Sequence, residues 1–141
     1  MTSEATERVA QPIQDDDVAF RFGPEVDVPD GEHPAMLVGL SSMFVNWDGE
    51  ERERIRWDFA PSDVPDLADG SPAMVSAWTS RSTGEKSTAR RWIAALRGAD
   101  AIANGAIIRG RDLAGLPCRI VVIHDDKGWP KVDLVLAPKA R

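Results

Sequence analysis

Cysteine and histidine are scarce in this chain, which limits the chemistry that it can perform. Among 141 residues there is one cysteine, Cys118, so no disulfide can form within the chain. The two histidines, His33 and His124, have no partner at the spacing of a metal site. Cys118 lies among apolar residues, as an inert buried thiol would. We therefore expect no catalytic residues, no metal and no cofactor, and a binding module rather than an enzyme.

Long apolar runs and targeting signals are also missing. No apolar stretch approaches the roughly 18 residues that a membrane-spanning helix requires. Residues 1–11 lack the basic and apolar regions of a secretory signal. Residues 83–88, TGEKST, do not match a phosphate-binding loop, because position 79 is Thr instead of Gly and Glu85 separates Gly84 from Lys86. They are more typical of a turn before a helix, with Thr83 or Ser87 as its N-cap. We expect a cytoplasmic protein that does not bind a membrane.

Acidic residues are concentrated near the N-terminus. Residues 1–34 hold nine acidic and two basic residues, a net charge of −7. The rest of the chain holds 14 acidic and 15 basic residues, a net charge of +1. The pI of about 4.9 therefore does not exclude nucleic-acid binding by the remainder. Residues 1–33 lack apolar periodicity and are expected to form a disordered acidic arm. This arm is either a solubilising tail or, through Asp15–Asp17, a mimic of nucleic acid.

The apolar pattern from residue 34 to 138 predicts an all-β domain with one helix. Strands are expected at 35–45, 51–60, 73–80, 118–124 and 131–136, with a bulge or tight bend at Gly39 and hairpin turns at Asp48-Gly49 and 125–128. Residues 86–98 place one apolar stripe at helical spacing and end at Gly98. The order β-β-β-α-β-β is that of the five-stranded Greek-key barrel called the OB-fold. A β-sandwich with an accessory helix is the alternative, and residues 139–141 are expected to be a tail.

Several local segments resemble those of small OB-fold, single-stranded-DNA-binding-like proteins carried by bacteriophages and actinobacterial genomes. These segments are 34–38 (PAMLV), 55–59 (IRWDF), 80–87 (SRSTGEKS) before the helix, and 112–118 (DLAGLPC). The resemblance covers about residues 34–138 and leaves the acidic arm out. It implies a role in phage-type DNA replication or recombination, with replication or recombination proteins as possible partners of the arm.

Basic and aromatic residues near the second and third strands suggest a surface for single-stranded nucleic acid. Such binders combine a positively charged groove with aromatic rings on which bases stack, and OB-folds use the second and third strands for this. Trp57 and Trp92 fall on apolar stripes and are expected in the core, whereas the other three tryptophans are candidate platforms. The predicted binding residues are Arg54, Arg56, Arg81, Lys86, Arg90 and Arg91, with Trp47, Trp78 and Trp129.

Two functions follow from this pattern. The first is binding of single-stranded DNA without sequence specificity. The second is a protein–protein interaction adaptor that uses the same barrel, and a homo-oligomer is possible in either case through an unpaired strand edge. The alternative for the basic residues is a solvated face without a binding role. DNA binding requires them to gather on one face beside exposed indole rings.

Overall fold

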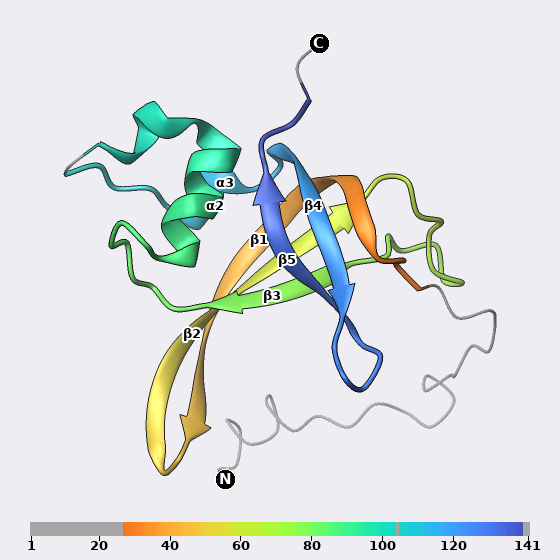
Figure 1. Ribbon diagram of the computed structural model, residues 1–141, viewed down its shortest axis with the longest axis horizontal. Coiled ribbons are helices and arrows are strands. Elements are labelled where there is room, and N and C mark those ends of the chain that lie inside the picture. The colour runs from red at the N-terminus through yellow and green to blue at the C-terminus, as the bar shows by residue number, and fades with distance from the viewer. Residues whose placement is uncertain (1–26, 104, 140–141) are drawn as a thin grey trace, which may run out of the picture.

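The computed structural model describes residues 27–103 and 105–139, apart from the side chain of Trp47. Within these residues, five antiparallel strands form one sheet in the order β3-β2-β1-β4-β5 (Figure 1). The strands are β1 (Gly31–Trp47), β2 (Glu50–Pro61), β3 (Val75–Thr79), β4 (Pro117–His124) and β5 (Pro130–Leu136). The prediction of a mostly β domain with five strands is confirmed. The predicted arm lies, up to residue 26, outside the described residues.

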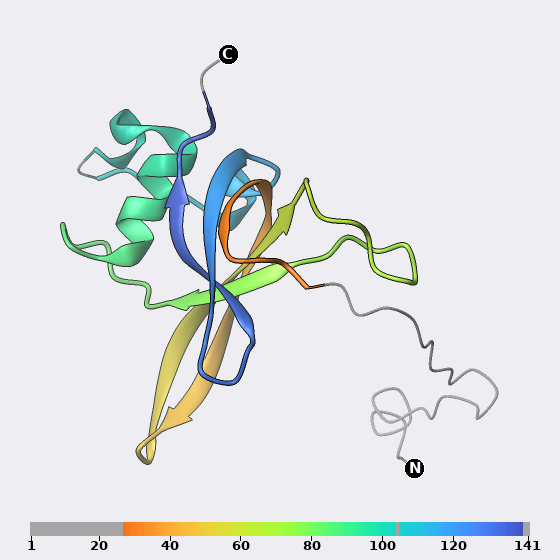
Figure 2. The same ribbon diagram turned by 45° about the vertical axis from the view of Figure 1, so that its right-hand side comes forward.

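The long β1–β2 hairpin is bent where the sequence predicted. Pairing between the two strands shifts between Leu37 and Gly39, which marks a β-bulge at the expected glycine. Asp48 and Gly49 both have positive φ angles, 56° and 80°, as a two-residue hairpin turn of this kind requires. Beyond the segments that pair with β4 and β3, the hairpin extends as a two-stranded ribbon. Its tip and the tip of the β4–β5 hairpin point away from α2 and α3 (Figure 2).

The segment between β3 and β4 holds more helix than the sequence predicted. The main helix, α2 (Thr88–Arg97), begins after Ser87, whose side chain accepts a hydrogen bond from the Arg90 backbone N–H, and it ends at Gly98. A 3-10 helix, η2 (Ala99–Ile102), and a one-turn helix, α3 (Gly110–Leu113), follow. The prediction of a single helix was therefore wrong, because four-residue helices are too short to produce a periodic apolar stripe.

An aromatic cluster forms the centre of the core between the sheet and α2. The Trp92 ring lies edge-on to Trp57 and Phe59, with centroid separations of 5.3 Å and 6.0 Å. Such edge-to-face geometry is favourable for aromatic pairs. The buried Trp57 indole donates a 2.9 Å hydrogen bond to Thr79 on β3. Both tryptophans that were predicted to be core residues are thus confirmed in that role.

The domain incorporates residues that precede the expected first strand. Val28 is 2% exposed and His33 is 6% exposed, so both belong to the packed interior. Strands β3 and β5 are the two edge strands of the sheet, and they contact each other. Among the described residues, no backbone ladder joins them. In the described part of the chain, no helix has the length and apolar character needed to cross a membrane.

Candidate nucleic-acid interface

Strand β2 presents different residues on its two faces, as its alternating sequence predicted. Trp57 and Phe59 are buried against α2, and Ile55 is partly buried on the same face. Residues at alternate positions point to the opposite face. The arginines at positions 52, 54 and 56 therefore share the outer face, which lies away from the aromatic core.

Strand β3 adds an exposed indole ring to this outer face. Trp78 is 42% exposed and lies directly opposite Arg56 in the antiparallel pair. Its neighbours on the same face are Met74, which is 51% exposed, and Ser76, while Val75, Ala77 and Thr79 are buried. The ring lines a hollow together with Val45, Arg52 and Arg54. The outer face thus brings an aromatic ring next to two guanidinium groups.

Trp78 also lines a second hollow, whose far wall is the β4–β5 hairpin. This hairpin contributes Trp129, which is 65% exposed, and two lysines, Lys127 and Lys131. Trp78 lines both hollows, and we call the two hollows together the aromatic groove. Its residues are Val45, Arg52 and Arg54 in the first hollow, Trp78 in both, and Asp27, Met74, Val75, Ser76, Asp125, Lys127, Gly128, Trp129, Pro130 and Lys131 in the second.

The arginines on the outer face of β2 differ in how strongly they are engaged. Arg56 forms an ion pair of 3.1 Å with Asp58, which also accepts a hydrogen bond from Ser76. Arg52 makes a long 3.4 Å contact with the exposed Glu50. The side chain of Arg54 forms no hydrogen bond or ion pair with any other described residue. Arg54 is therefore available to a ligand, whereas the charge of Arg56 is largely compensated.

The turn of the β4–β5 hairpin fixes Trp129 at the mouth of the groove. The Asp125 carboxylate accepts hydrogen bonds from the backbone N–H groups of Lys127 and Trp129, at 2.9 Å and 3.0 Å. These bonds, that of Trp129 first, lower the pKa of Asp125, and the nearby Lys131 and Lys127 also contribute. The hairpin turn predicted at residues 125–128 is confirmed. The two bonds to Asp125 fix the backbone of Lys127 and Trp129 within this turn.

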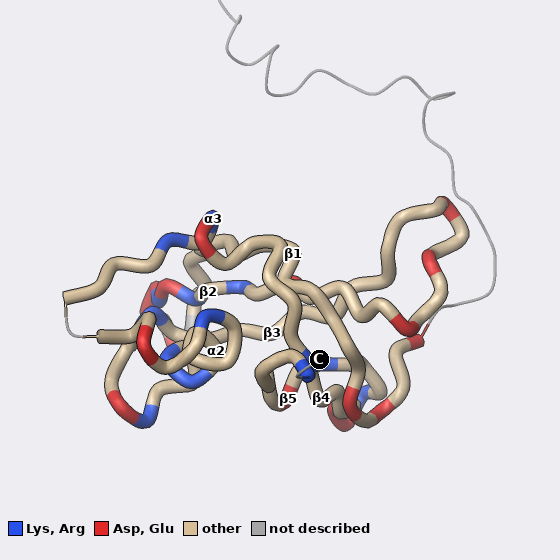
Figure 3. The backbone as a smooth tube through the Cα atoms, turned by 90° about the horizontal axis from the view of Figure 1, so that it is seen from above, with Lys and Arg blue, Asp and Glu red and all other residues tan. Residues whose placement is uncertain are grey.

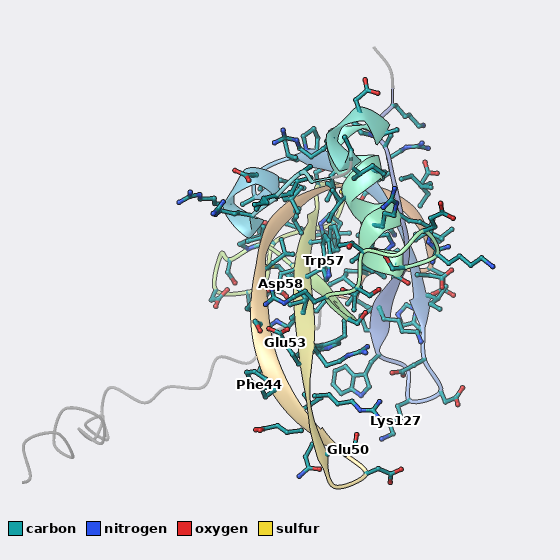
Figure 4. The ribbon with its side chains drawn as sticks, turned by 90° about the vertical axis from the view of Figure 1, so that its left-hand side faces the viewer. Phe44, Glu50, Glu53, Trp57, Asp58 and Lys127 are labelled. Atoms are coloured by element: carbon teal, nitrogen blue, oxygen red, sulfur yellow. The ribbon has the colours of Figure 1, made fainter. Side chains whose placement is uncertain are left out.

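The remaining predicted cations lie on the helix side of the domain. Arg81 donates hydrogen bonds of 2.7 Å and 2.5 Å to Glu53, which lies opposite Phe44 in the β1–β2 pair. Arg90 donates to the Thr83 carbonyl at 3.1 Å. Figure 4 shows Phe44 and Lys127 on opposite sides of the β1–β2 hairpin. The helix-side cations, Arg81, Lys86, Arg90 and Arg91, do not line the aromatic groove.

The structure thus divides the predicted site into two surfaces. Arg54, Trp78 and Trp129 come together in the aromatic groove, and Arg56 lies beside Trp78. Basic and acidic residues are intermixed along the backbone around α2 (Figure 3). Trp47 ends β1 at the hairpin tip, opposite Glu50, but its side chain is outside the described residues, as are Asp15–Asp17 of the arm.

Sequence reasoning missed several groove residues. Lys127 and Lys131 lie on a hairpin that is remote from β3 in sequence, and only Trp129 had marked this turn as exposed. Met74 was placed on the same face as Trp78 but was not assigned a role. One sequence signal points to these lysines: both lie close to the predicted turn at residues 125–128, next to Trp129, which was expected to be exposed.

Cys118 is buried in the core, and both histidines are engaged by neighbouring residues. Cys118 is 2% exposed, and burial raises the pKa of its thiol to about 11, so the prediction of a buried thiol is confirmed. Within residues 27–103 and 105–139, no group of three or more metal-ligating side chains is arranged to hold an ion. The histidines contact carboxylates and a backbone carbonyl instead.

Together, these features define a small antiparallel β-sheet domain with an exposed groove of aromatic and cationic residues. No protein-family model matches this chain, and no curated protein matches it either. The function must therefore be inferred from the groove itself.

Proposed function

We propose that the domain is an OB-fold-like Greek-key barrel that binds single-stranded DNA without sequence specificity. The sheet order, the contact between β3 and β5, and the position of α2 between β3 and β4 support this fold. An OB-fold binds oligonucleotides on the face of its second and third strands, between the loops that join strands 1–2 and 4–5. The aromatic groove occupies the corresponding place in this domain.

The groove supplies both kinds of contact that sequence-independent binding needs. Bases of any identity stack on exposed rings, at about 1–3 kcal/mol for each base. The exposed indoles of Trp78 and Trp129 offer two such rings within one hollow. Arg54, Lys127 and Lys131 are placed to contact phosphates along the same path. The presence of two exposed indoles beside unburied cations is the observation on which this proposal depends.

The resemblance noted in the sequence extends the proposal to a biological setting. We propose that single-stranded DNA exposed during phage-type replication or recombination is the ligand. The acidic arm is proposed to contact replication or recombination proteins, or to compete for the groove.

The test measures the affinity of the full chain for a labelled oligo-dT by fluorescence anisotropy at about 50 mM salt, where phosphate contacts are strong. We expect Trp78→Ala and Trp129→Ala each to weaken binding by about 5- to 100-fold, the equivalent of one lost stacking contact. Raising the salt concentration should weaken binding of all the proteins.

Two controls separate loss of binding from loss of folding. Ile107→Ala removes an apolar side chain that is 76% exposed and lies outside the groove, so its affinity should equal that of the wild type. Circular dichroism should report the same fold for all variants. If the wild-type chain does not bind oligo-dT at low salt, or if both tryptophan variants bind as tightly as the wild type, the proposal is wrong.

An adaptor that binds another protein is the second candidate function. From Val38 to Trp47, β1 has no strand partner other than β2 among the described residues, and this edge carries no charged residue. Phe44, 67% exposed, lies on this segment. Charges normally protect such edges from pairing with other chains. Partner binding that tolerates high salt, combined with no affinity for oligo-dT, would favour this function.

A further inference from the structure

A histidine between two carboxylates fastens the Asp27–Asp30 segment to the end of β4. Nε2 of His124 lies 3.0 Å from Oδ1 of Asp27, and its Nδ1 lies 2.5 Å from Oδ1 of Asp30. An ionised carboxylate only accepts hydrogen bonds, and a neutral imidazole donates from only one of its nitrogens. Both contacts are therefore satisfied at once when His124 is the doubly protonated imidazolium. Consistent with this geometry, the bonds to Asp27 and then Asp30 raise the pKa of His124.

One of these two carboxylates also belongs to the aromatic groove. Asp27 lines the same hollow as Trp78, Trp129 and the two hairpin lysines, whereas Asp30 does not line it. A carboxylate at this position repels a polyanion that enters the groove. The imidazolium of His124 offsets that repulsion as long as it keeps its proton.

We infer that Asp27 and His124 couple the binding of an anionic strand in the aromatic groove to the protonation of His124. This inference rests on the proposed function and adds a regulatory residue pair to the same site. Loss of the proton leaves the charges of Asp27 and Asp30 uncompensated at the rim of the groove. The affinity for the anionic strand therefore falls as the pH rises through the pKa of His124.

The other charged groups around His124 do not reverse this sign. Asp125 follows it directly in the chain, and Lys127 and Lys131 belong to the same hairpin. A carboxylate and ammonium groups keep their charges across the range in which a histidine titrates. Only the charge of His124 therefore changes at this end of the groove between mildly acidic and mildly alkaline solution.

The experiment measures the affinity of the full chain for labelled oligo-dT at fixed ionic strength from about pH 5.5 to 8.5, the range in which histidines titrate. We expect the wild-type dissociation constant to rise about threefold across this range, as the loss of one partly screened charge would produce. His124→Gln and Asp27→Asn should each flatten the profile. Asp27→Asn should also bind more tightly than the wild type at the alkaline end.

Two matched variants test whether position matters and not charge alone. Asp126→Asn removes a negative charge from the hairpin that follows His124 but lies outside the groove lining, so it should keep the wild-type pH profile. Asp30→Asn removes a partner of His124 that does not line the groove. This substitution should move the midpoint of the affinity profile to lower pH without abolishing the pH dependence.

Nuclear magnetic resonance distinguishes His124 from the second histidine. His33 is buried, its Nδ1 lies 2.9 Å from Asp63, and its Nε2 lies 2.7 Å from the Pro29 carbonyl. Although burial lowers its pKa, these bonds raise it overall. The binding profile should follow the titration of the His124 resonance, and saturating oligo-dT should raise the pKa of His124, because coupling between two binding events is reciprocal.

The possible failures can be told apart. Binding that does not vary with pH in the wild type, an unchanged pH profile in both His124→Gln and Asp27→Asn, or a His124 pKa unaffected by oligo-dT would each overturn this inference and leave the proposed function standing. Absence of binding at every pH by all the proteins would overturn the proposed function, and this inference with it.

Discussion

The aromatic groove and the helix side of the domain contain similar residues that are arranged for different purposes. In the groove, Arg54 has no partner in the described part of the chain and lies in one hollow with the exposed ring of Trp78. On the helix side, Arg81 is bound to Glu53, and Trp57 and Trp92 are both buried. The two surfaces therefore differ in how far their cations are engaged by partners and in whether exposed rings lie beside them. The proposed binding depends on both differences.

The largest expected difference between the two regions is the loss in free energy of unfolding when a tryptophan of each region is replaced by alanine. Trp92→Ala should lower the free energy of unfolding by about 3–5 kcal/mol, because it opens a cavity beside Trp57 and Phe59. Trp129→Ala should change it by less than about 0.5 kcal/mol, as is usual for exposed positions. Urea unfolding followed by circular dichroism measures both values. A large loss of stability in Trp129→Ala would show that this ring supports the hairpin and is not free for stacking.

A smaller difference is expected between the arginines of the two surfaces. Arg54→Ala should weaken oligo-dT binding by about 5- to 10-fold and reduce the slope of log affinity against log salt by about 0.7, the value for one lost phosphate contact on a single strand. Arg91→Ala, the matched change on the helix side, should alter neither the affinity nor the salt slope, since the Arg91 side chain donates to Thr88 and lies outside the groove. Equal effects of the two substitutions would mean that the strand also passes over α2.

The sequence was sufficient to predict those parts of the fold that depend on local patterns. The alternation of β2 separated Trp57 and Phe59 from the arginines, and Asp48-Gly49 and Gly39 marked a turn and a bulge that the structure contains. These features follow from the two-residue period of a strand and from the φ angles that glycine permits.

The candidate site was predicted only in part, because it depends on contacts between distant segments. Nothing near Arg81 in sequence indicates that Glu53, 28 residues earlier, binds its guanidinium group. Nor does the sequence indicate that the β4–β5 hairpin places Trp129 in the same hollow as Trp78. The strand order determines both relationships, and it cannot be read from the pattern of a single strand.

The smallest expected effect concerns the ion pair between Arg81 and Glu53 on the helix side of the domain. Hydrogen bonds from Arg81 and then Ser42 lower the pKa of Glu53 from 4.5 to about 2. A carboxylate with a lowered pKa contributes stability above its unfolded-state pKa, and that contribution is lost as the pH falls through the folded-state value. The stability difference between the wild type and Glu53→Gln should therefore be present at neutral pH and disappear between about pH 4.5 and 2.

Urea unfolding over this pH range measures the contribution, and Glu51→Gln is the matched control. Glu51 is an exposed carboxylate on the same strand that does not bind Arg81, so its substitution should have a smaller effect at neutral pH. Affinity for oligo-dT at neutral pH should be the same in Glu53→Gln and the wild type, because neither member of the pair lines the aromatic groove. Tighter binding by Glu53→Gln would instead mean that Arg81, once released, reaches the strand, so the helix side would be part of the interface.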